Sequence, residues 1–198
     1  MKALTILEDE EFLRQKSSIV DLNDKDLKND IEIIEEYCMS HDVLAMASVQ
    51  LGIPKRIVYL KNTNLDMVKK IEEDEELKNS YNEAKILINP VVIKKEGLTK
   101  YWEACASCLD NVGLVKRPYK IYLEYVDVNG EKHSEIFEGF ESTVLSHELD
   151  HLDGILHMDI ADKLLYMERE ERKKLREKED YLVISKTGDF DKLKTQLK

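Results

Sequence analysis

Cysteine, basic charge and long hydrophobic runs are all scarce in this sequence of 198 residues. Three cysteines are too few for a disulfide framework, so we expect thiols or metal ligands in a reducing compartment. Acidic residues outnumber lysine and arginine by 41 to 30, and the net charge of -11 argues against DNA or RNA as the main substrate. No apolar run is long enough to span a membrane. These absences disfavour a disulfide-rich, a nucleic-acid-binding and a membrane-spanning protein.

The N-terminal residues and the composition indicate a cytoplasmic, globular chain. The N-terminus turns acidic at Glu8, before the apolar region of a signal peptide could form. The sequence is 42% hydrophobic and 36% charged, which is typical of a globular protein with a highly charged surface. It contains no internal repeat and no low-complexity tract. Its length predicts one domain with room for an appendage.

The segment from His147 to His151 carries the pattern H-E-x-x-H. Residues four apart lie on the same face of an α-helix, so the two histidines can hold one metal ion. Glu148 lies beside them and can reach a water molecule at that ion. Apolar residues around the motif recur at helical spacing, and Gly154 stands where a glycine commonly ends a helix. The pattern therefore predicts a helix that serves metal-assisted hydrolysis.

Apolar periodicity predicts one further helix and a set of strands. A helical pattern covers residues 23–41. Alternating or continuous apolar residues predict strands at residues 56–60, 86–93, 120–128 and 131–138. Pro90 is expected at an edge or bend of the second strand. Asn129–Gly130 is typical of a type I′ hairpin turn. The charged stretch 61–84 predicts a solvated insertion.

The C-terminal part of the chain differs in charge from the rest. Residues 161–198 carry a net charge of +2, whereas residues 1–160 carry -13. A thin apolar stripe predicts an exposed, charged helix over residues 161–180. We therefore expect a catalytic domain of residues 1–160 and a charged C-terminal helical extension of residues 161–198. The expected fold class is α+β, with antiparallel strands packed around a central metal-binding H-E-x-x-H helix.

A catalytic tetrahedral site needs a third protein ligand and an open position. Glu170 and Glu171 could supply a carboxylate, as in a metalloprotease, but their run of alternating charge is typical of a solvated helix face. Cys105 and Cys108 have the spacing C-x-x-C. If both thiols bind, the site is a closed structural zinc site, and if one binds, the site is open and catalytic. The spacing leaves both possibilities open.

Three segments stand in a fixed order along the chain: V-L-A-M-A-S-V-Q (43–50), E-A-C-A-S (103–107) and H-E-L-D-H (147–151). They resemble the motifs G-φ-G-φ-A-A-P-Q, E-G-C-φ-S and H-E-φ-D-H of peptide deformylases, where φ is apolar. This family of metalloenzymes removes the formyl group from nascent bacterial proteins. The resemblance covers roughly residues 1–160. It implies that this chain hydrolyses the N-formyl group of N-terminal formylmethionine and releases formate.

The resemblance also implies the metal ligands. Cys105 keeps the frame E-x-C-x-S, so it is the expected third ligand beside His147 and His151, and Cys108 is a neighbouring free thiol. The implied cofactor is one divalent metal ion, Fe²⁺ in the first place, with Zn²⁺ or Ni²⁺ able to occupy the site. Supporting ion pairs are expected among Glu103, Arg117 and Asp150.

The implied chemistry uses a general base and an oxyanion site. Glu148 takes the proton of the attacking water and passes it to the leaving amine. The Gln50 side-chain amide and the Ala106 backbone N–H stabilise the oxyanion. The methionine side chain of the substrate is expected in a pocket that includes Leu44, Ala45, Thr143 and Val144.

This chain departs from the family motifs at several small residues. Val43 and Ala45 replace both glycines of the first motif, Ser48 and Val49 replace its second alanine and its proline, and Ala104 replaces the glycine of the second. We expect these changes where the family's backbone contacts substrate. Two alternatives follow: a divergent hydrolase that acts on another N-formyl or acyl substrate, and a non-catalytic binding protein stabilised by a Cys2His2 zinc site.

The resemblance gives expectations about partners as well. N-formylated nascent peptides are the expected substrates, and a monomer is the expected state. In some members of the family a C-terminal helix docks on the ribosome, and the net charge of +2 of residues 161–198 is compatible with such a contact.

Overall fold

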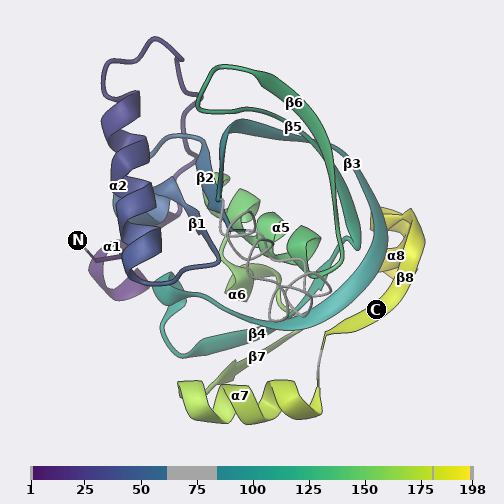
Figure 1. Cartoon of the computed structure of the whole chain (residues 1–198). Coiled ribbons are helices and arrows are strands. Elements are labelled where there is room, and N and C mark those ends of the chain that lie inside the picture. Colours follow the sequence, from purple (N-terminus) through teal and green to yellow (C-terminus); the bar gives the residue numbers. More distant parts are fainter. Residues whose placement is uncertain (1, 62–83, 180, 197–198) are drawn as a thin grey trace, which may run out of the picture.

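Helices lie on both sides of a curved antiparallel sheet in the computed structural model, which describes residues 2–61, 84–179 and 181–196 (Figure 1). The helices are α1 (Ile6–Leu13), α2 (Leu27–Ser40), α5 (Phe140–Leu152), α6 (His157–Ile160), α7 (Arg169–Lys178) and α8 (Phe190–Gln196), with 3-10 turns η1 (Ser48–Leu51) and η2 (Ala106–Cys108). The strands are β1 (Ala45–Ala47), β2 (Ile57–Leu60), β3 (Lys85–Ala104), β4 (Asn111–Arg117), β5 (Lys120–Val126), β6 (Lys132–Glu138), β7 (Lys163–Tyr166) and β8 (Leu182–Asp189). Nearly all of the predicted insertion at 61–84 lies outside the described residues. No described helix has the length and apolar character needed to cross a membrane.

The long strand β3 organises the sheet. It pairs antiparallel with β2, β4, β5 and β8, while β1 pairs with β2, β6 with β5 and β7 with β4. Its pairing with β5 shifts register between Ile88 and Val91, on either side of the predicted bend at Pro90. The mixed class of helices with an antiparallel sheet is thus confirmed.

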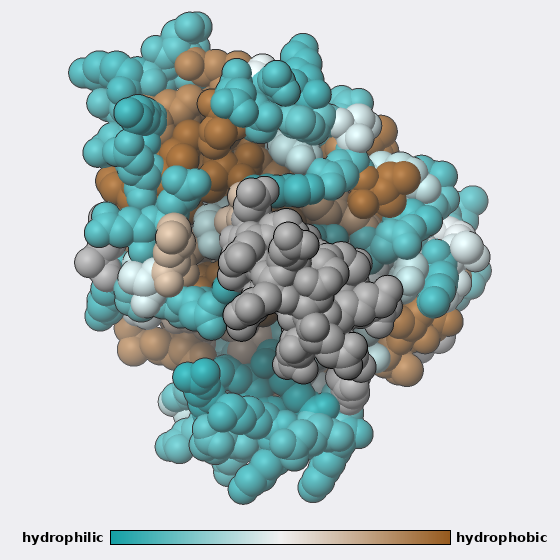
Figure 2. Space-filling view, viewed as in Figure 1, coloured by the Kyte–Doolittle hydropathy of each residue, from teal (hydrophilic) through white to brown (hydrophobic). Residues whose placement is uncertain are grey.

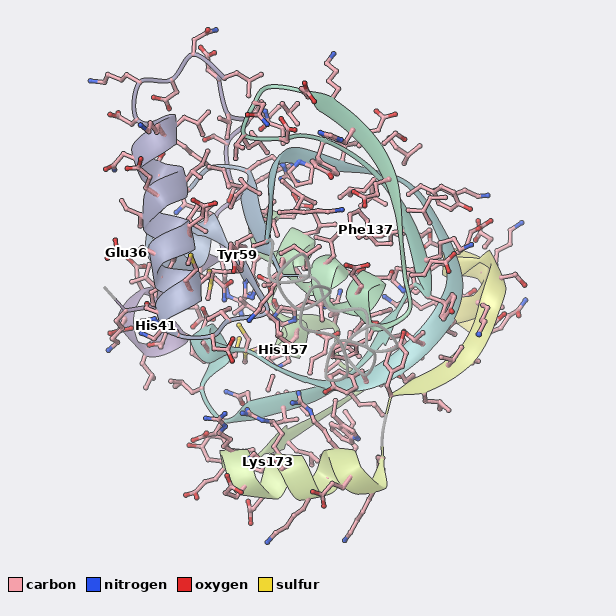
Figure 3. The ribbon with its side chains drawn as sticks, in the orientation of Figure 1. Glu36, His41, Tyr59, Phe137, His157 and Lys173 are labelled. Carbon is pink, nitrogen blue, oxygen red and sulfur yellow. The ribbon has the colours of Figure 1, made fainter. Side chains whose placement is uncertain are left out.

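Strand β2 is buried on both faces because helices lie against both. Val58 and Leu60 belong to a core cluster with the apolar face of α5, and Phe137 of β6 joins the same cluster. Ile57 and Tyr59 belong to a second cluster, with apolar residues of α2. Figure 3 shows Tyr59 beside α2 and Phe137 on the side of α5. A strand covered on both faces is apolar throughout, which explains the unbroken run at 57–60.

Contacts fix both the apolar face and the C-terminal end of helix α5. Leu145, Leu149 and Leu152 are buried and pack in the core cluster with the strands. The helix is followed by Gly154, which has φ +74°. A Cβ at this position would lie 2.1 Å from the Arg14 carbonyl oxygen, so only glycine fits. The predicted glycine at the end of the H-E-x-x-H helix is confirmed.

The predicted hairpin is confirmed, but its predicted turn type is wrong. Strands β5 and β6 pair as expected. A type I′ turn needs positive φ at both central residues, and only Gly130 (φ 82°) has it. Instead, Asp127 Oδ1 accepts the backbone N–H groups of Asn129 (2.8 Å) and Glu131 (2.9 Å). The aspartate side chain thus organises a longer loop.

The predicted helix over residues 161–180 is only partly correct. Residues Lys163–Tyr166 form β7, which pairs with β4, and α7 begins at Arg169. After α7, β8 pairs with β3 and α8 follows. The extension is therefore not purely helical, because sheet edges offered by β3 and β4 override the local helical pattern. The domain division at residue 160 stays a prediction.

Candidate active site

Three potential metal-ligand atoms converge at the end of β3 and on α5. Cys105 Sγ and His147 Nε2 each lie 3.2 Å from His151 Nε2, and the three ligand atoms all lie within 4.8 Å of one another. Tetrahedral bonds of about 2.0–2.3 Å place neighbouring ligand atoms about 3.4 Å apart. The thiol and the two imidazoles therefore fit a single divalent ion in both geometry and chemistry.

A buried ion network fixes one of these imidazoles. His147 Nδ1 lies 2.8 Å from Glu103 Oε2. Glu103 in turn accepts two hydrogen bonds from Arg117, of 2.7 and 2.9 Å, and Arg117 also contacts Asp150. When Nδ1–H donates to the carboxylate, the lone pair of His147 is at Nε2, facing the other two ligand atoms. The predicted ion network is confirmed.

Electrostatics favour the ligand forms of these side chains. Burial opposes ionisation of Glu103, but the charge and hydrogen bonds of Arg117 outweigh it and hold the carboxyl pKa far below its usual range. The Cys108 thiol hydrogen-bonds Cys105, and together with His151 it lowers the pKa of Cys105 despite burial. Cys105 is therefore disposed to be a thiolate, the form that binds metals.

Glu148 and Gln50 meet at the backbone of β1. The Ala47 N–H donates to Glu148 Oε2 (2.9 Å) and to Gln50 Oε1 (3.1 Å). Gln50 Nε2 donates to Cys105 Sγ (3.2 Å) and Ser107 Oγ (3.0 Å). Burial raises the pKa of Glu148, which moves its proton exchange toward neutral pH. The first and second motifs are thus joined to the third by hydrogen bonds.

A cavity of about 470 Å³ opens beside these groups. It is lined by Gln50, Cys105, Ala106, His147 and Glu148, and also by every residue predicted for the substrate pocket, namely Leu44, Ala45, Thr143 and Val144. A larger cavity of about 630 Å³ contains none of the three ligand residues, so it is not the site. Sequence reasoning missed several lining residues because no local motif marks them: Tyr37, Tyr101, Phe140, Arg172 and Arg176.

Comparison with known proteins decides the family. Residues 1–166 match the family described as polypeptide deformylase. The chain belongs to this family. The peptide deformylase of Rhizobium meliloti (strain 1021) is 35% identical over 165 residues, which cover 83% of this chain and 87% of that protein. These matches support a peptide deformylase function, which is that of a metal-dependent hydrolase that removes N-formyl groups.

Solved deformylase structures share the fold. A probable peptide deformylase from Synechococcus phage S-SSM7 aligns with a TM-score of 0.66 and 28% identity, covering 80% of this chain and 98% of that one. A peptide deformylase from Synechococcus elongatus, solved in complex with actinonin, aligns with a TM-score of 0.66 and 25% identity, covering 90% and 87%.

The departures from the deformylase motifs fall into two groups. Val43, Ala45 and Ala104 line the cavity. Ser48 and Val49 do not: the Ser48 hydroxyl donates to the Lys55 carbonyl oxygen (2.5 Å), and Val49 packs in the core. The side chains of this pair point to the interior because of η1, and contact of these positions with substrate stays a prediction.

The cluster of candidate ligand atoms does not support the alternative of a closed Cys2His2 zinc site. The cluster of candidate ligands contains Cys105 and both histidines but not Cys108. Cys108 is fully buried in η2, and its thiol pKa is raised because it hydrogen-bonds the Cys105 sulfur and is buried. Glu170 and Glu171, the metalloprotease candidates, are exposed on α7 outside this cluster.

Proposed function

We propose that Cys105, His147 and His151 hold the catalytic metal ion of this peptide deformylase, and that α5 is the metal-binding helix around which the sheet is built. The convergence of their three ligand atoms within 4.8 Å carries this proposal. The bound ion supplies Lewis-acid activation of water. Fe²⁺ is the ion we expect from the family resemblance, and the donor set equally accepts Zn²⁺ or Ni²⁺.

Glu148 is the general base in this proposal. It takes a proton from the attacking water, whose oxygen bonds to the formyl carbon. It then gives the proton to the nitrogen as the C–N bond breaks, so that formate and a free α-amino group result. Its burial, its raised pKa and its place in the cavity wall support this role. The hydrogen bond from Ala47 holds one carboxylate oxygen and thereby orients the other.

Gln50 and Ala106 are the proposed stabilisers of the oxyanion that forms on the formyl oxygen. The Gln50 amide is held by the Ala47 N–H and Ser107 Oγ, so its orientation is set before substrate binds. Ala106 follows the Cys105 ligand directly and lines the same cavity. The Gln50 Nε2–H that contacts Cys105 Sγ is the one we assign to the oxyanion, and it exchanges that contact for the formyl oxygen when substrate binds.

The substrate side of the cavity accepts a formylated methionine. We assign its side chain to the wall formed by Leu44, Ala45, Thr143 and Val144. The substrates are then N-formylated nascent peptides. Contact with the ribosome through residues 161–198, a monomeric state and a cytoplasmic location stay predictions from the sequence.

Formate release from formyl-Met-Ala-Ser tests the proposal, with protein purified anaerobically and loaded with Fe²⁺. The variant Glu148→Gln keeps an oxygen that can accept the Ala47 N–H, so the fold and metal content are expected to persist. Its rate should fall by about 10²–10⁴-fold, the usual contribution of a general base.

Two outcomes would contradict the proposal. A metal-loaded wild-type protein that releases no formate is not a deformylase of this substrate. Acetate release from acetyl-Met-Ala-Ser in its place would favour the divergent acyl hydrolase, which the side chains of Val43 and Ala45 in the cavity make the second candidate. A Glu148→Gln variant with nearly full activity would remove Glu148 from the mechanism.

A further inference from the structure

Helix α7 reaches the active-site cavity although it lies beyond residues 1–166, which match the family. In Figure 1 it lies below β4 and β7, and it is far along the chain from the first motif at β1. Two of its side chains, Arg172 and Arg176, line the cavity together with Cys105, His147 and Glu148. Because they are four residues apart, both arginines project from the same face of the helix.

Arg176 anchors the helix to the strand that carries the Cys105 ligand. Its Nε and Nη2 donate to the Trp102 carbonyl oxygen at 2.9 and 2.6 Å, and its guanidinium lies 4.8 Å from the centre of the Tyr101 ring. In return, the Trp102 indole donates to Glu179 Oε2 at 2.8 Å. These contacts place α7 against β3 three residues before Cys105.

Arg172 has no such anchor. It is half-buried, and among the described residues its guanidinium has no hydrogen-bond or ion-pair partner. Burial lowers the pKa of Arg176, and the positive charge of Arg172 adds to this effect. Two guanidinium groups therefore repel each other at the cavity wall, and a carboxylate between or beside them would relieve the repulsion.

The acidic groups of the cavity do not compensate this charge. Asp42 is paired with Lys61 at 2.7 Å. Glu103 is paired with Arg117, and Glu148 is buried as the proposed base. The chain carries a net charge of -11, yet this wall of its active site is positive. Figure 2 shows the hydrophilic surface that α7 adds at this end of the molecule.

We propose that Arg172, positioned by the anchored α7 and backed by Arg176, recognises a carboxylate of the formylated substrate, so that this deformylase prefers acidic peptides. The inference rests on the proposed deformylase function and names a subclass of its substrates. The carboxylate belongs either to an acidic side chain after the formylmethionine or to the C-terminus of a short peptide. The planar guanidinium matches a carboxylate with two parallel hydrogen bonds in both cases.

The test compares substrates of nearly equal shape and different charge. We would measure kcat/KM for formyl-Met-Asp-Asp-amide and formyl-Met-Asn-Asn-amide, and for formyl-Met-Asn-Asn with a free C-terminus. For the wild-type enzyme we expect a preference of about fivefold for a charged peptide over the neutral amide, weakened by added salt. Preference for the Asp peptide assigns the side chain, and preference for the free C-terminus assigns the terminal carboxylate.

Substitutions of Arg172 test whether α7 causes the preference for charged peptides. Arg172→Gln should bring the ratio of charged to neutral peptide close to one, and Arg172→Glu should invert it. Arg169→Gln, the matched control on the same helix, removes an exposed arginine that does not line the cavity and should leave the ratio unchanged. A ratio is insensitive to a general loss of folded protein, so it separates recognition from stability.

The inference is overturned if the neutral peptide releases formate while the wild-type ratios are near one, or if both Arg172 variants keep the wild-type ratio. In either case the deformylase function stands. If none of the three peptides releases formate, the proposed function fails and the inference fails with it.

Discussion

The active-site cavity has two walls that differ in how their charges are held. Behind the wall that carries the candidate ligands, on β3, β4 and α5, charged groups are buried and paired: Arg117 bonds Glu103, and Glu103 bonds His147. On the wall formed by α7, Arg172 is half-buried and has no ion-pair partner among the described residues. The buried network fixes the side chains around the candidate ligands, whereas the guanidinium of Arg172 is left without a charge partner.

This difference has a physical basis in the cost of burying charge. A buried ion needs partners of opposite charge or hydrogen-bonding partners, and each partner needs partners of its own. The charged groups around the candidate ligands therefore form a closed network. A partly solvated arginine can remain unpaired at little cost because water still reaches it. The proposed catalytic groups therefore lie on the buried side of the cavity, and the proposed recognition of a carboxylate lies on the half-buried α7 side.

The largest expected effect comes from breaking the buried network. Arg117→Met leaves the carboxylates of Glu103 and Asp150 without their partner, so we expect a loss of about 3–5 kcal/mol in the free energy of unfolding. Arg169→Met on the exposed face of α7 is the matched control, with a change within about 0.5 kcal/mol. Urea unfolding of both metal-loaded variants measures the difference, and equal losses would show that the buried ion network adds nothing to stability beyond an exposed arginine.

A smaller effect is expected from changing the partner of the proposed ligand His147. Glu103→Gln keeps a hydrogen-bond acceptor but removes the negative charge that raises the basicity of the imidazole, so metal affinity should fall about 10–100-fold. Competition with a chelator gives the affinity. Glu124→Gln, the same substitution at an exposed site on β5, should leave the affinity at the wild-type value. An undiminished affinity in Glu103→Gln would make the network purely structural.

The smallest effect is expected at Cys108. Because it stands outside the cluster of ligand atoms, Cys108→Ser should keep the metal content of the wild-type protein. Cys105→Ser, three residues earlier, should lose the ion on dialysis, since a hydroxyl is a far poorer ligand than a thiolate. Elemental analysis measures the metal content of the two variants and shows which thiol the ion needs. Loss of metal from Cys108→Ser would instead support the closed Cys2His2 site.

Local patterns were sufficient where the determining contacts are close in sequence. Helix α5 was predicted with its terminal glycine because the 3.6-residue period and the Gly154 position are local signals. The hairpin of β5 and β6 was predicted for the same reason. Its turn was not, because the Asp127 side chain competes with the Asn-Gly signal for the loop's N–H groups. The first part of the helix predicted over residues 161–180 is strand β7 instead, because it pairs with β4.

The H-E-x-x-H spacing is enough to place two histidines on one helix face with Glu148 beside them, since an α-helix brings such residues together whatever surrounds it. Spacing alone left Cys105 and Cys108 as equal candidates. Only the tertiary structure brings Cys105 Sγ to 3.2 Å from His151 Nε2, and only it carries Arg172 to the same cavity. Both outcomes depend on packing between segments far apart in the chain, and no local pattern encodes such contacts.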